Sequence, residues 1–164
     1  MNWTLRPATI ADLDELAELR AVVMRPDLER LGRYDEHRVR QRLRDAYAPE
    51  HTRIIEVDGE LAGSITMRPA PPTADGPGGD RPGGDGPATG GTRWLEHFYL
   101  SPHHQGQGLG TAVLGTVLGA ADADQATVRL NVLQGSPARK LYERHGFVVE
   151  DEDPVDVFMV RKFL

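Results

Sequence analysis

Residues 94–110 read WLEHFYLSPHHQGQGLG, a strand-like apolar run followed by a glycine-bearing turn. Beyond the turn, Leu109, Val113 and Leu114 recur at the spacing of one helical face. Because glycine lacks a Cβ, the turn Gln105–Gly110 lets the backbone approach a ligand closely. A helix that starts at such a turn offers unpaired backbone N–H groups and the positive end of its dipole. The stretch predicts a strand–turn–helix unit suited to a phosphate group.

Two better-known phosphate-binding patterns do not fit this turn. The dinucleotide pattern G-x-G-x-x-G would require glycine at the position of Thr111, and no Gly-Lys-Ser/Thr follows as in a P-loop. A glycine turn before a helix, taken alone, is more often structural than phosphate-binding. The turn therefore needs a second motif before it indicates a function.

Working outward, hydrophobic periodicity predicts an alternation of strands and helices. A first helix opens at Thr9 or Asp12 and ends at Pro26, and Asp35 caps a second one that Pro49 closes. Asp58-Gly59 is a tight-turn signal between two strands. The strands are expected at 3–6, 53–57, 61–67, 93–100, 126–133, 147–150 and 155–160, and a further helix at 137–144. This order predicts an α/β fold, a mixed sheet with helices on its faces.

Residues 71–91 interrupt the periodic pattern. They hold Gly, Pro, Asp, Thr, Ala and one Arg, with the short repeat Pro77-Gly78-Gly79-Asp80 and Pro82-Gly83-Gly84-Asp85. Such a composition buries too little apolar surface to offset the entropy cost of ordering. We expect a flexible insertion within a single domain that spans residues 1–164.

Composition excludes several classes of protein. With no cysteine among 164 residues, disulfides and thiolate metal sites are excluded. The net charge of −6 with scattered basic residues argues against nucleic-acid binding. No apolar run approaches the ~20 residues of a membrane span, and the first residues lack a signal core. His103 and His104 have no third ligand at a metal-site spacing, so we expect no metal site. Because membrane-span and signal patterns are missing, we expect a cytoplasmic location.

The stretch from Trp94 to Gly110 resembles motif A of the GNAT superfamily of N-acetyltransferases. Gln105, Gly108 and Gly110 match its Q/R-x-x-G-x-G/A signature. A second motif, N-x-x-A-x-x-L-Y-x-x-x-G-F, is matched at Ala138, Leu141, Tyr142, Gly146 and Phe147. This chain departs from it at Gly135, where the family has asparagine, and Ser136 is a candidate substitute. The resemblance implies the GNAT fold, a central mixed, mostly antiparallel sheet with splayed strands and about four flanking helices.

The resemblance also implies how acetyl-CoA would bind. The pantetheine arm would pair with backbone groups of one strand, and the pyrophosphate would rest on backbone N–H groups of the turn and the helix start. Arg139 would meet a coenzyme A phosphate, although an exposed charged helix face explains that arginine equally well. The implied cofactor-binding residues are Phe98, Tyr99, Leu100, Gln105, Gly106, Gln107, Gly108, Leu109, Gly110, Thr111, Ser136 and Arg139.

The implied reaction is acetyl transfer from acetyl-CoA to a primary amine by direct attack. Tyr142 matches the tyrosine that donates a proton to the departing sulfur, and the competing interpretation is a residue that packs against the sheet. Glu96 is the candidate base, directly or through water, and a solvated strand carboxylate is the alternative. His97 is the rival base because its ordinary pKa suits proton transfer at neutral pH. Strand alternation places Glu96 and His97 on opposite faces unless a bulge intervenes.

The acceptor is expected to be a small-molecule or peptide amine, with a homodimer left open. It would contact residues 25–34 and 151–158, where arginines could bind an acidic group or simply pair with neighbouring acids. Asp153 and Asp156 could attract an amine or cap a turn. The alternative function is a non-catalytic acyl-CoA-binding or sensor module on the same fold, because fold does not fix function.

Overall fold

The computed structural model describes residues 2–70 and 91–163. Within these ranges the elements follow the order predicted from the sequence. The helices are α1 (Leu13–Arg30), α2 (Glu36–Ala46), α3 (Leu109–Ala123) and α4 (Ala138–Arg144). The strands are β1 (Trp3–Pro7), β2 (Thr52–Val57), β3 (Glu60–Pro69), β4 (Thr92–Leu100), β5 (Thr127–Leu133), β6 (Val148–Glu152) and β7 (Asp156–Arg161).

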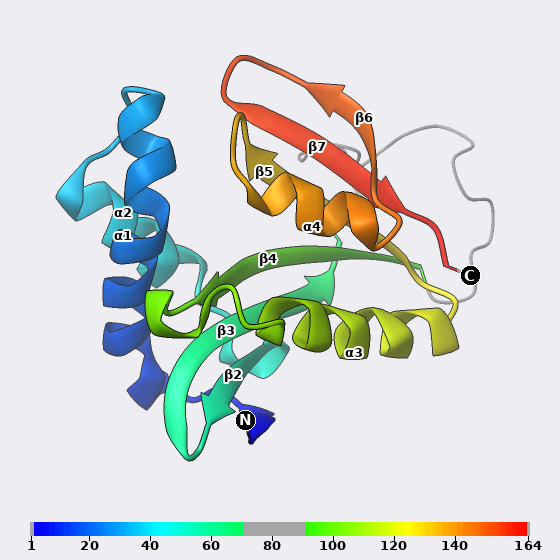
Figure 1. Cartoon of the computed structure of the whole chain (residues 1–164), viewed down its shortest axis with the longest axis horizontal. Coiled ribbons are helices and arrows are strands. Elements are labelled where there is room, and N and C mark those ends of the chain that lie inside the picture. Colours follow the sequence, from blue (N-terminus) through cyan, green and yellow to red (C-terminus); the bar gives the residue numbers. More distant parts are fainter. Residues whose placement is uncertain (1, 71–90, 164) are drawn as a thin grey trace. The chain divides into compact units, whose positions relative to one another are not determined.

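The strands form one seven-stranded mixed sheet in the order β1-β2-β3-β4-β5-β7-β6 (Figure 1). The pairs β1–β2, β2–β3, β5–β7 and β6–β7 are antiparallel, whereas β4 and β5 are parallel. The parallel ladder runs from Thr92 opposite Thr127 to Trp94 opposite Arg129. The predicted α/β class is therefore confirmed, and the splaying of two strands stays a prediction.

The chain divides into two compact units, each of which is described by itself. Unit 1 comprises Met1–Thr66 and Glu96–Gly110, and unit 2 comprises Met67–Leu95 and Thr111–Leu164. The expected insertion at 71–91 lies, apart from Gly91, outside the described residues. The expectation of one domain with a flexible insertion stays a prediction.

The core of unit 1 lies where α1 and α2 meet the first strands. Ala8, Leu16, Ala17, Leu43 and Ile54 form a buried cluster with relative exposures of 8% or less. The two helices lie side by side in Figure 1, and ion pairs join them at Arg40–Glu18 and Arg44–Asp14. The cap predicted at Asp35 is confirmed, since its Oδ1 accepts a 2.7 Å hydrogen bond from the backbone N–H of Arg38.

The expected end of the first helix at Pro26 is wrong. Proline lacks a backbone N–H and usually breaks a helix interior, yet α1 continues to Arg30. The helix ends in a Schellman motif around Gly32, whose φ is 68°. The N–H of Arg33 bonds the carbonyl of Leu28, and that of Gly32 bonds the carbonyl of Glu29. Pro26 therefore removes one backbone donor from α1 without ending the helix.

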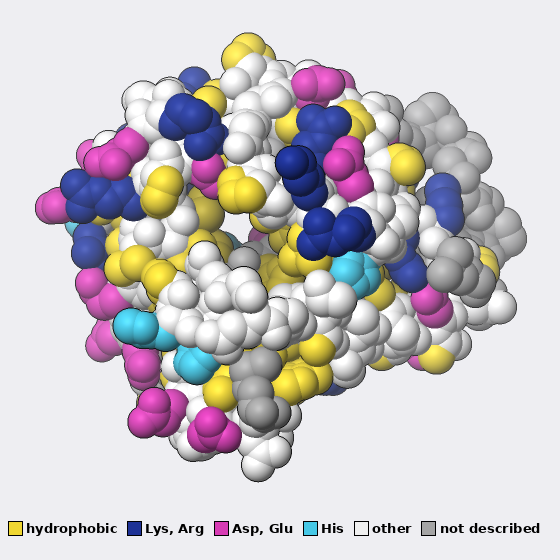
Figure 2. Space-filling view, viewed as in Figure 1, with side chains coloured by type: hydrophobic (Ala, Val, Ile, Leu, Met, Phe, Trp, Pro, Cys, Tyr) yellow, Lys and Arg dark blue, Asp and Glu magenta, His cyan; other side chains and the backbone are white. Residues whose placement is uncertain are grey.

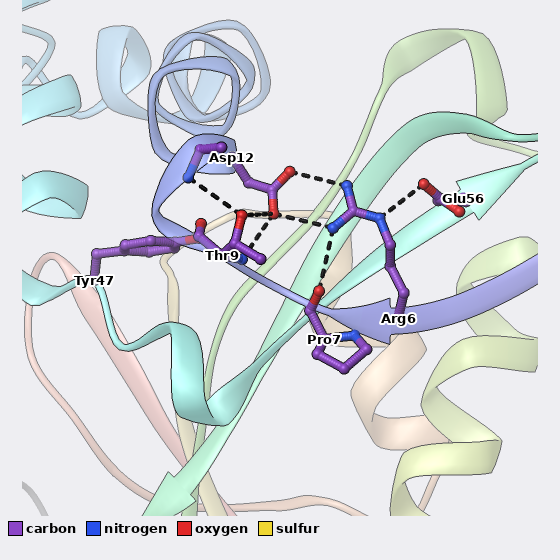
Figure 3. A network of polar contacts seen from close by, with 7 residues as sticks. Arg6, Pro7, Thr9, Asp12, Tyr47 and Glu56 are labelled. Carbon is purple, nitrogen blue, oxygen red and sulfur yellow. Dashed lines mark hydrogen bonds and ion pairs between the residues drawn. The ribbon is translucent and has the colours of Figure 1, made fainter.

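An arginine-centred network fixes the start of α1 to the first two strands (Figure 3). The guanidinium of Arg6 on β1 bonds both carboxylate oxygens of Asp12 at 3.0 and 2.9 Å, and its Nε bonds Glu56 on β2 at 2.8 Å. Asp12 also accepts a hydrogen bond from the N–H of Thr9 at 2.8 Å, which completes a capping box. These contacts hold the pKa of Asp12 below its ordinary 3.8, and the Arg6 hydrogen bond is the largest cause.

This network predicts an acid-sensitive contribution to stability. Because the pKa of Asp12 is lowered in the folded state, its contribution is present above pH 3.8 and is lost as pH falls through the folded pKa. We expect Asp12→Asn to lower the free energy of unfolding by about 1–2 kcal/mol at pH 7, and by progressively less toward about pH 2. Urea unfolding across this pH range measures the effect.

The matched control is Asp14→Asn at the same helix start. The side chain of Asp14 is 87% exposed and pairs with Arg44 at 2.7 Å. An exposed pair of this kind contributes about 0–1 kcal/mol. A loss of stability for Asp12→Asn that does not change with pH would contradict the charge-based explanation.

Unit 2 is built around one apolar face of β5 and β7. Val128, Leu130 and Met159 are at most 2% exposed. Arg161 at the end of β7 bonds both carboxylate oxygens of Asp122 on α3 at 2.8 and 2.9 Å and the carbonyl of His145 at 2.8 Å. This arginine therefore ties the ends of α3 and α4 to the last strand.

Candidate active site

The glycine turn lies between a short 3-10 helix, Pro102–His104, and the start of α3. Gly106 and Gly108 have φ angles of 76° and 83°, in the left-handed region that favours glycine. Residues 105–108 are exposed, and a Cβ built on either glycine would meet no atom within 4 Å. In the described part of the chain, the backbone N–H groups of Gly106, Gln107 and Gly108 make no hydrogen bond. They are open to an anionic ligand, as a phosphate-binding turn requires.

Two glutamine side chains of the turn donate hydrogen bonds to nearby backbone carbonyls. Gln105 donates from Nε2 to the carbonyl of Leu100 at 2.9 Å, and Gln107 donates from Nε2 to the carbonyl of His103 at 3.1 Å. The side chain of Leu109 is buried at 1% exposure and anchors the helix start. The signature glutamine thus shapes the turn, and ligand binding would fall to the main chain.

Strand β4 departs from regular extended geometry at His97. Its φ of 50° is left-handed, which is uncommon for a residue other than glycine. The carbonyl of His97 accepts a 2.9 Å hydrogen bond from the hydroxyl of Ser64 on β3. Simple alternation therefore does not describe Glu96 and His97.

The ring of His97 belongs to a buried chain of polar contacts with Tyr99 and Arg20. The Tyr99 hydroxyl lies 2.9 Å from Nδ1 of His97 and accepts a 2.9 Å hydrogen bond from Nε of Arg20 on α1. Arg20 also donates to the carbonyl of Val39 at 2.5 Å. Burial raises the pKa of Tyr99 above its ordinary 10.0, and the charge of Glu96 acts in the same direction. Sequence reasoning missed Arg20, although it lies on the apolar stripe of α1 with Leu16 and Ala17.

The second motif forms helix α4 and its ends. Ser136, the candidate substitute for the family's asparagine, accepts a 3.2 Å hydrogen bond from the N–H of Ala138, the first residue of α4. Gly135 before it has a φ of 78°. Glycine adopts this left-handed conformation most easily, and asparagine is the next most tolerant residue type. The replacement of the family's asparagine by Gly135 therefore keeps the left-handed backbone accessible. Arg139 pairs with Glu143 along the helix at 3.2 Å, and Figure 2 likewise shows basic side chains beside acidic ones.

The spacing from Tyr142 to Phe147 has a structural explanation. The N–H of Phe147 bonds the carbonyl of Tyr142, and that of Gly146 bonds the carbonyl of Glu143, so α4 ends in a Schellman motif. The rings of Tyr142 and Phe147 meet edge to face with centroids 5.7 Å apart. Tyr142 is 8% exposed. The motif spacing therefore follows from helix termination, and a catalytic role for Tyr142 needs its own test.

The segments expected to bind the acceptor make their own internal pairs. Arg25 pairs with Glu29 at 3.0 Å, and its guanidinium lies 4.8 Å from the ring centre of Tyr34. Asp153 Oδ1 accepts hydrogen bonds from the N–H groups of residues 155 and 156 at 2.8 and 2.7 Å, as a turn cap does. Arg25 thus pairs with a neighbouring acid and Asp153 caps a turn. These are the alternatives to acceptor binding that the sequence left open.

The predicted site residues fall into two groups. The first group, in unit 1, is brought together by β4 and the glycine turn and comprises Glu96, Phe98, Tyr99, Leu100 and Gln105 to Gly110. The second group, in unit 2, comprises Thr111, Ser136, Arg139 and Tyr142. Their assignment to cofactor binding and catalysis stays a prediction.

Comparison with known proteins identifies the class to which this fold and turn belong. A sequence profile described as the acetyltransferase (GNAT) family matches residues 13–147. The search of curated proteins gave no match. Because the profile covers most of the chain, the protein belongs to the GNAT acetyltransferase family.

Solved structures agree with this fold. The chain is similar to the PaiA N-acetyltransferase of Thermoplasma acidophilum, crystallised with coenzyme A, with 22% identity, a TM-score of 0.71 and coverage of 99% of this chain and 100% of that one. PH1933 from Pyrococcus horikoshii OT3 gives 20% identity, a TM-score of 0.71 and 99% coverage of both chains. At these identities the likeness concerns the fold.

Two further properties of the described residues bear on the site. They contain no group of three or more His, Asp or Glu side chains placed to hold a metal ion. None of their helices is long and apolar enough to cross a membrane.

Proposed function

We propose that this protein transfers the acetyl group of acetyl-CoA to a primary amine of a small-molecule or peptide acceptor. The observation that carries the proposal is the exposed turn at Gly106–Gly108, whose backbone N–H groups are open at the start of α3. In a GNAT chain this turn suits the pyrophosphate of coenzyme A, because both the open donors and the helix dipole favour an anion.

Direct attack requires two proton transfers. The amine nitrogen forms a bond to the acetyl carbon, the carbon–sulfur bond breaks, and the proton lost by the amine goes to Glu96, directly or through water. The departing thiolate takes a proton from the hydroxyl of Tyr142, which later recovers one from solvent. The carbonyl oxygen gains charge during attack, and backbone N–H donors on β4 would stabilise it.

Thiol release tests the proposal. Free coenzyme A is measured as acetyl-CoA is mixed with a panel of amines that includes polyamines, amino acids, aminoglycosides and peptide N-termini. Acetylation of at least one amine, identified by mass spectrometry, is the expected result. Binding of acetyl-CoA in calorimetry without transfer to any amine would favour the alternative of a non-catalytic acyl-CoA sensor. Failure to bind coenzyme A at all would contradict both.

The proton donor is tested by Tyr142→Phe. The edge contact with Phe147 and the helix end should survive, because only the hydroxyl is lost. We expect the single-turnover rate of acetyl transfer to fall by about 10²-fold, while acetyl-CoA affinity changes little. Rapid-quench measurement is needed because product release can limit steady-state turnover.

The control for the loss of a tyrosine hydroxyl is Tyr47→Phe. The hydroxyl of Tyr47 donates to the carbonyl of Thr9 at 2.6 Å, in the Arg6 network of unit 1. Its removal should leave the transfer rate unchanged. A wild-type single-turnover rate in Tyr142→Phe would assign Tyr142 to packing alone.

A further inference from the structure

The short helix α4 carries Tyr142, the proposed proton donor, near its C-terminal end. The helix has only 7 residues, Ala138–Arg144. Isolated helices of this length are marginal in water, because too few hydrogen bonds form to offset the cost of starting the helix. The position of the Tyr142 side chain therefore depends on contacts that hold the end of α4 from outside the helix.

The end of α4 makes a closed set of backbone hydrogen bonds around Tyr142. The carbonyl of Tyr142 accepts hydrogen bonds from the N–H groups of His145 and Phe147, at 3.0 and 3.1 Å. The N–H of Gly146 bonds the carbonyl of Glu143 at 3.1 Å. The carbonyl of His145 takes no part in this set and has its partner on another element.

That partner is Arg161, at the end of β7. Its Nε donates to the carbonyl of His145 at 2.8 Å, and its two terminal nitrogens donate to the carboxylate of Asp122 on α3 at 2.8 and 2.9 Å. The side chain is 7% exposed and lies against Gly146, where a Cβ would be 3.6 Å from Nε. Because the guanidinium is planar and rigid, its two bonds to Asp122 fix the direction in which Nε meets His145.

We propose that Arg161 is a positioning residue for acetyl transfer, which fixes the end of α4 and with it the hydroxyl of Tyr142. One residue links the two, since Nε of Arg161 holds the carbonyl of His145 and the N–H of His145 holds the carbonyl of Tyr142. The inference rests on the proposed function, in which this hydroxyl gives its proton to the departing thiolate. Proton transfer requires heavy atoms about 2.6–3.2 Å apart, so a small displacement of the donor slows the reaction.

Arg93 provides the matched control, because it makes a similar ion pair at the end of α3. Its Nη2 donates to Oδ2 of Asp124, the residue after α3, at 2.7 Å. Among the described residues, the side chain of Arg93 makes no hydrogen bond to α4 or to the turn that ends it. Both arginines belong to unit 2, and of the two only Arg161 also holds the end of α4.

Amide hydrogen exchange tests this role without any substrate. Arg161→Lys keeps a cation opposite Asp122, but an ammonium lacks the planar fork that meets a carboxylate and a carbonyl at fixed angles. We expect the amides of Gly146 and Phe147 to exchange at least about tenfold faster in this variant, because their hydrogen bonds close the turn that Arg161 holds. Arg93→Lys should leave both exchange rates unchanged. Wild-type exchange of these two amides in Arg161→Lys would overturn the proposal.

A double-mutant cycle tests the link to Tyr142, once an acceptor amine is in hand. Arg161→Lys should lower the single-turnover rate of acetyl transfer by about tenfold, with acetyl-CoA affinity unchanged. In the Tyr142→Phe background the same substitution should change the rate by less than about twofold, because the hydroxyl that it displaces is already absent. A merely structural residue would lower the rate by the same factor in both backgrounds, and that result would overturn the proposal. Arg93→Lys should not change the rate in either background.

Asp122→Asn is the second variant, which decides the matter if Arg161→Lys does not fold. The amide accepts from the guanidinium through one oxygen instead of two, so the direction of Nε is less well fixed. We expect the same pattern with a smaller factor, a rate about threefold lower than wild type and no further loss in the Tyr142→Phe background. Equal losses in both backgrounds would again overturn the proposal.

The outcomes separate this inference from the proposed function. If Tyr142→Phe transfers acetyl at the wild-type rate, or if no amine is acetylated, the proposed function fails and the positioning role fails with it. If Tyr142→Phe is slow and Arg161→Lys acts equally in both backgrounds, the proton donor stands and only the role of Arg161 is overturned.

Discussion

Gly108→Asp is expected to abolish binding of acetyl-CoA, whereas Gly108→Asn should retain a measurable part of it. The two side chains have nearly the same size, and both tolerate the left-handed backbone that position 108 requires at a φ of 83°. They differ in charge. A carboxylate at the exposed turn would repel the pyrophosphate from the open N–H groups of the turn, and an amide would not.

Calorimetry with acetyl-CoA measures this difference. For the wild type we expect micromolar affinity, about −8 kcal/mol, and for the aspartate variant a loss of at least about 100-fold relative to asparagine. Circular dichroism should show both variants folded, since a Cβ at Gly108 meets no atom within 4 Å. Equal affinities of the two variants would place the pyrophosphate elsewhere.

Gly63→Ala is expected to cause a large loss of stability, because an added methyl group has no room at this position. A Cβ on Gly63 in β3 would lie 2.0 Å from the carbonyl oxygen of Tyr99 and 3.2 Å from the Cα of Leu100. Both are backbone atoms of β4 and cannot move aside as a flexible side chain would. We expect the free energy of unfolding to fall by at least about 3 kcal/mol.

Gly119→Ala is the matched control for an added methyl group. Gly119 is exposed on α3, and a Cβ there meets nothing within 4 Å. Alanine should stabilise this helix by about 0.5–1 kcal/mol. Urea unfolding of both variants gives the comparison, and a wild-type midpoint for Gly63→Ala would contradict the close approach of β3 to β4.

The helix cap, the tight turn and the glycine turn could be predicted because their causes are local. Asp35 caps α2 with its own side chain, and Asp58-Gly59 turns the chain with φ angles of 51° and 85°. The open turn at Gly106–Gly108 likewise depends on residues within one short segment. In each case the residues that cause the feature lie within a few positions of it in the chain. The amino-acid sequence by itself therefore determined these features.

The end of α1 was also encoded locally, but by a signal that competes with another. Pro26 is a breaker, whereas Gly32 completes a Schellman motif that supplies two backbone hydrogen bonds. Rules applied one residue at a time favoured the proline. The structure shows the helix continuing to the glycine because the hydrogen bonds of the whole turn count together.

The polar contacts that join Arg20, Tyr99 and His97 were decided by tertiary structure alone. Arg20 and Tyr99 are 79 residues apart, and no local pattern indicates that they meet. His97, whose φ is left-handed, accepts a hydrogen bond at its carbonyl from Ser64, 33 residues away. Burial in unit 1 gives these hydrogen bonds their strength, because a polar group removed from water must find its partners within the protein.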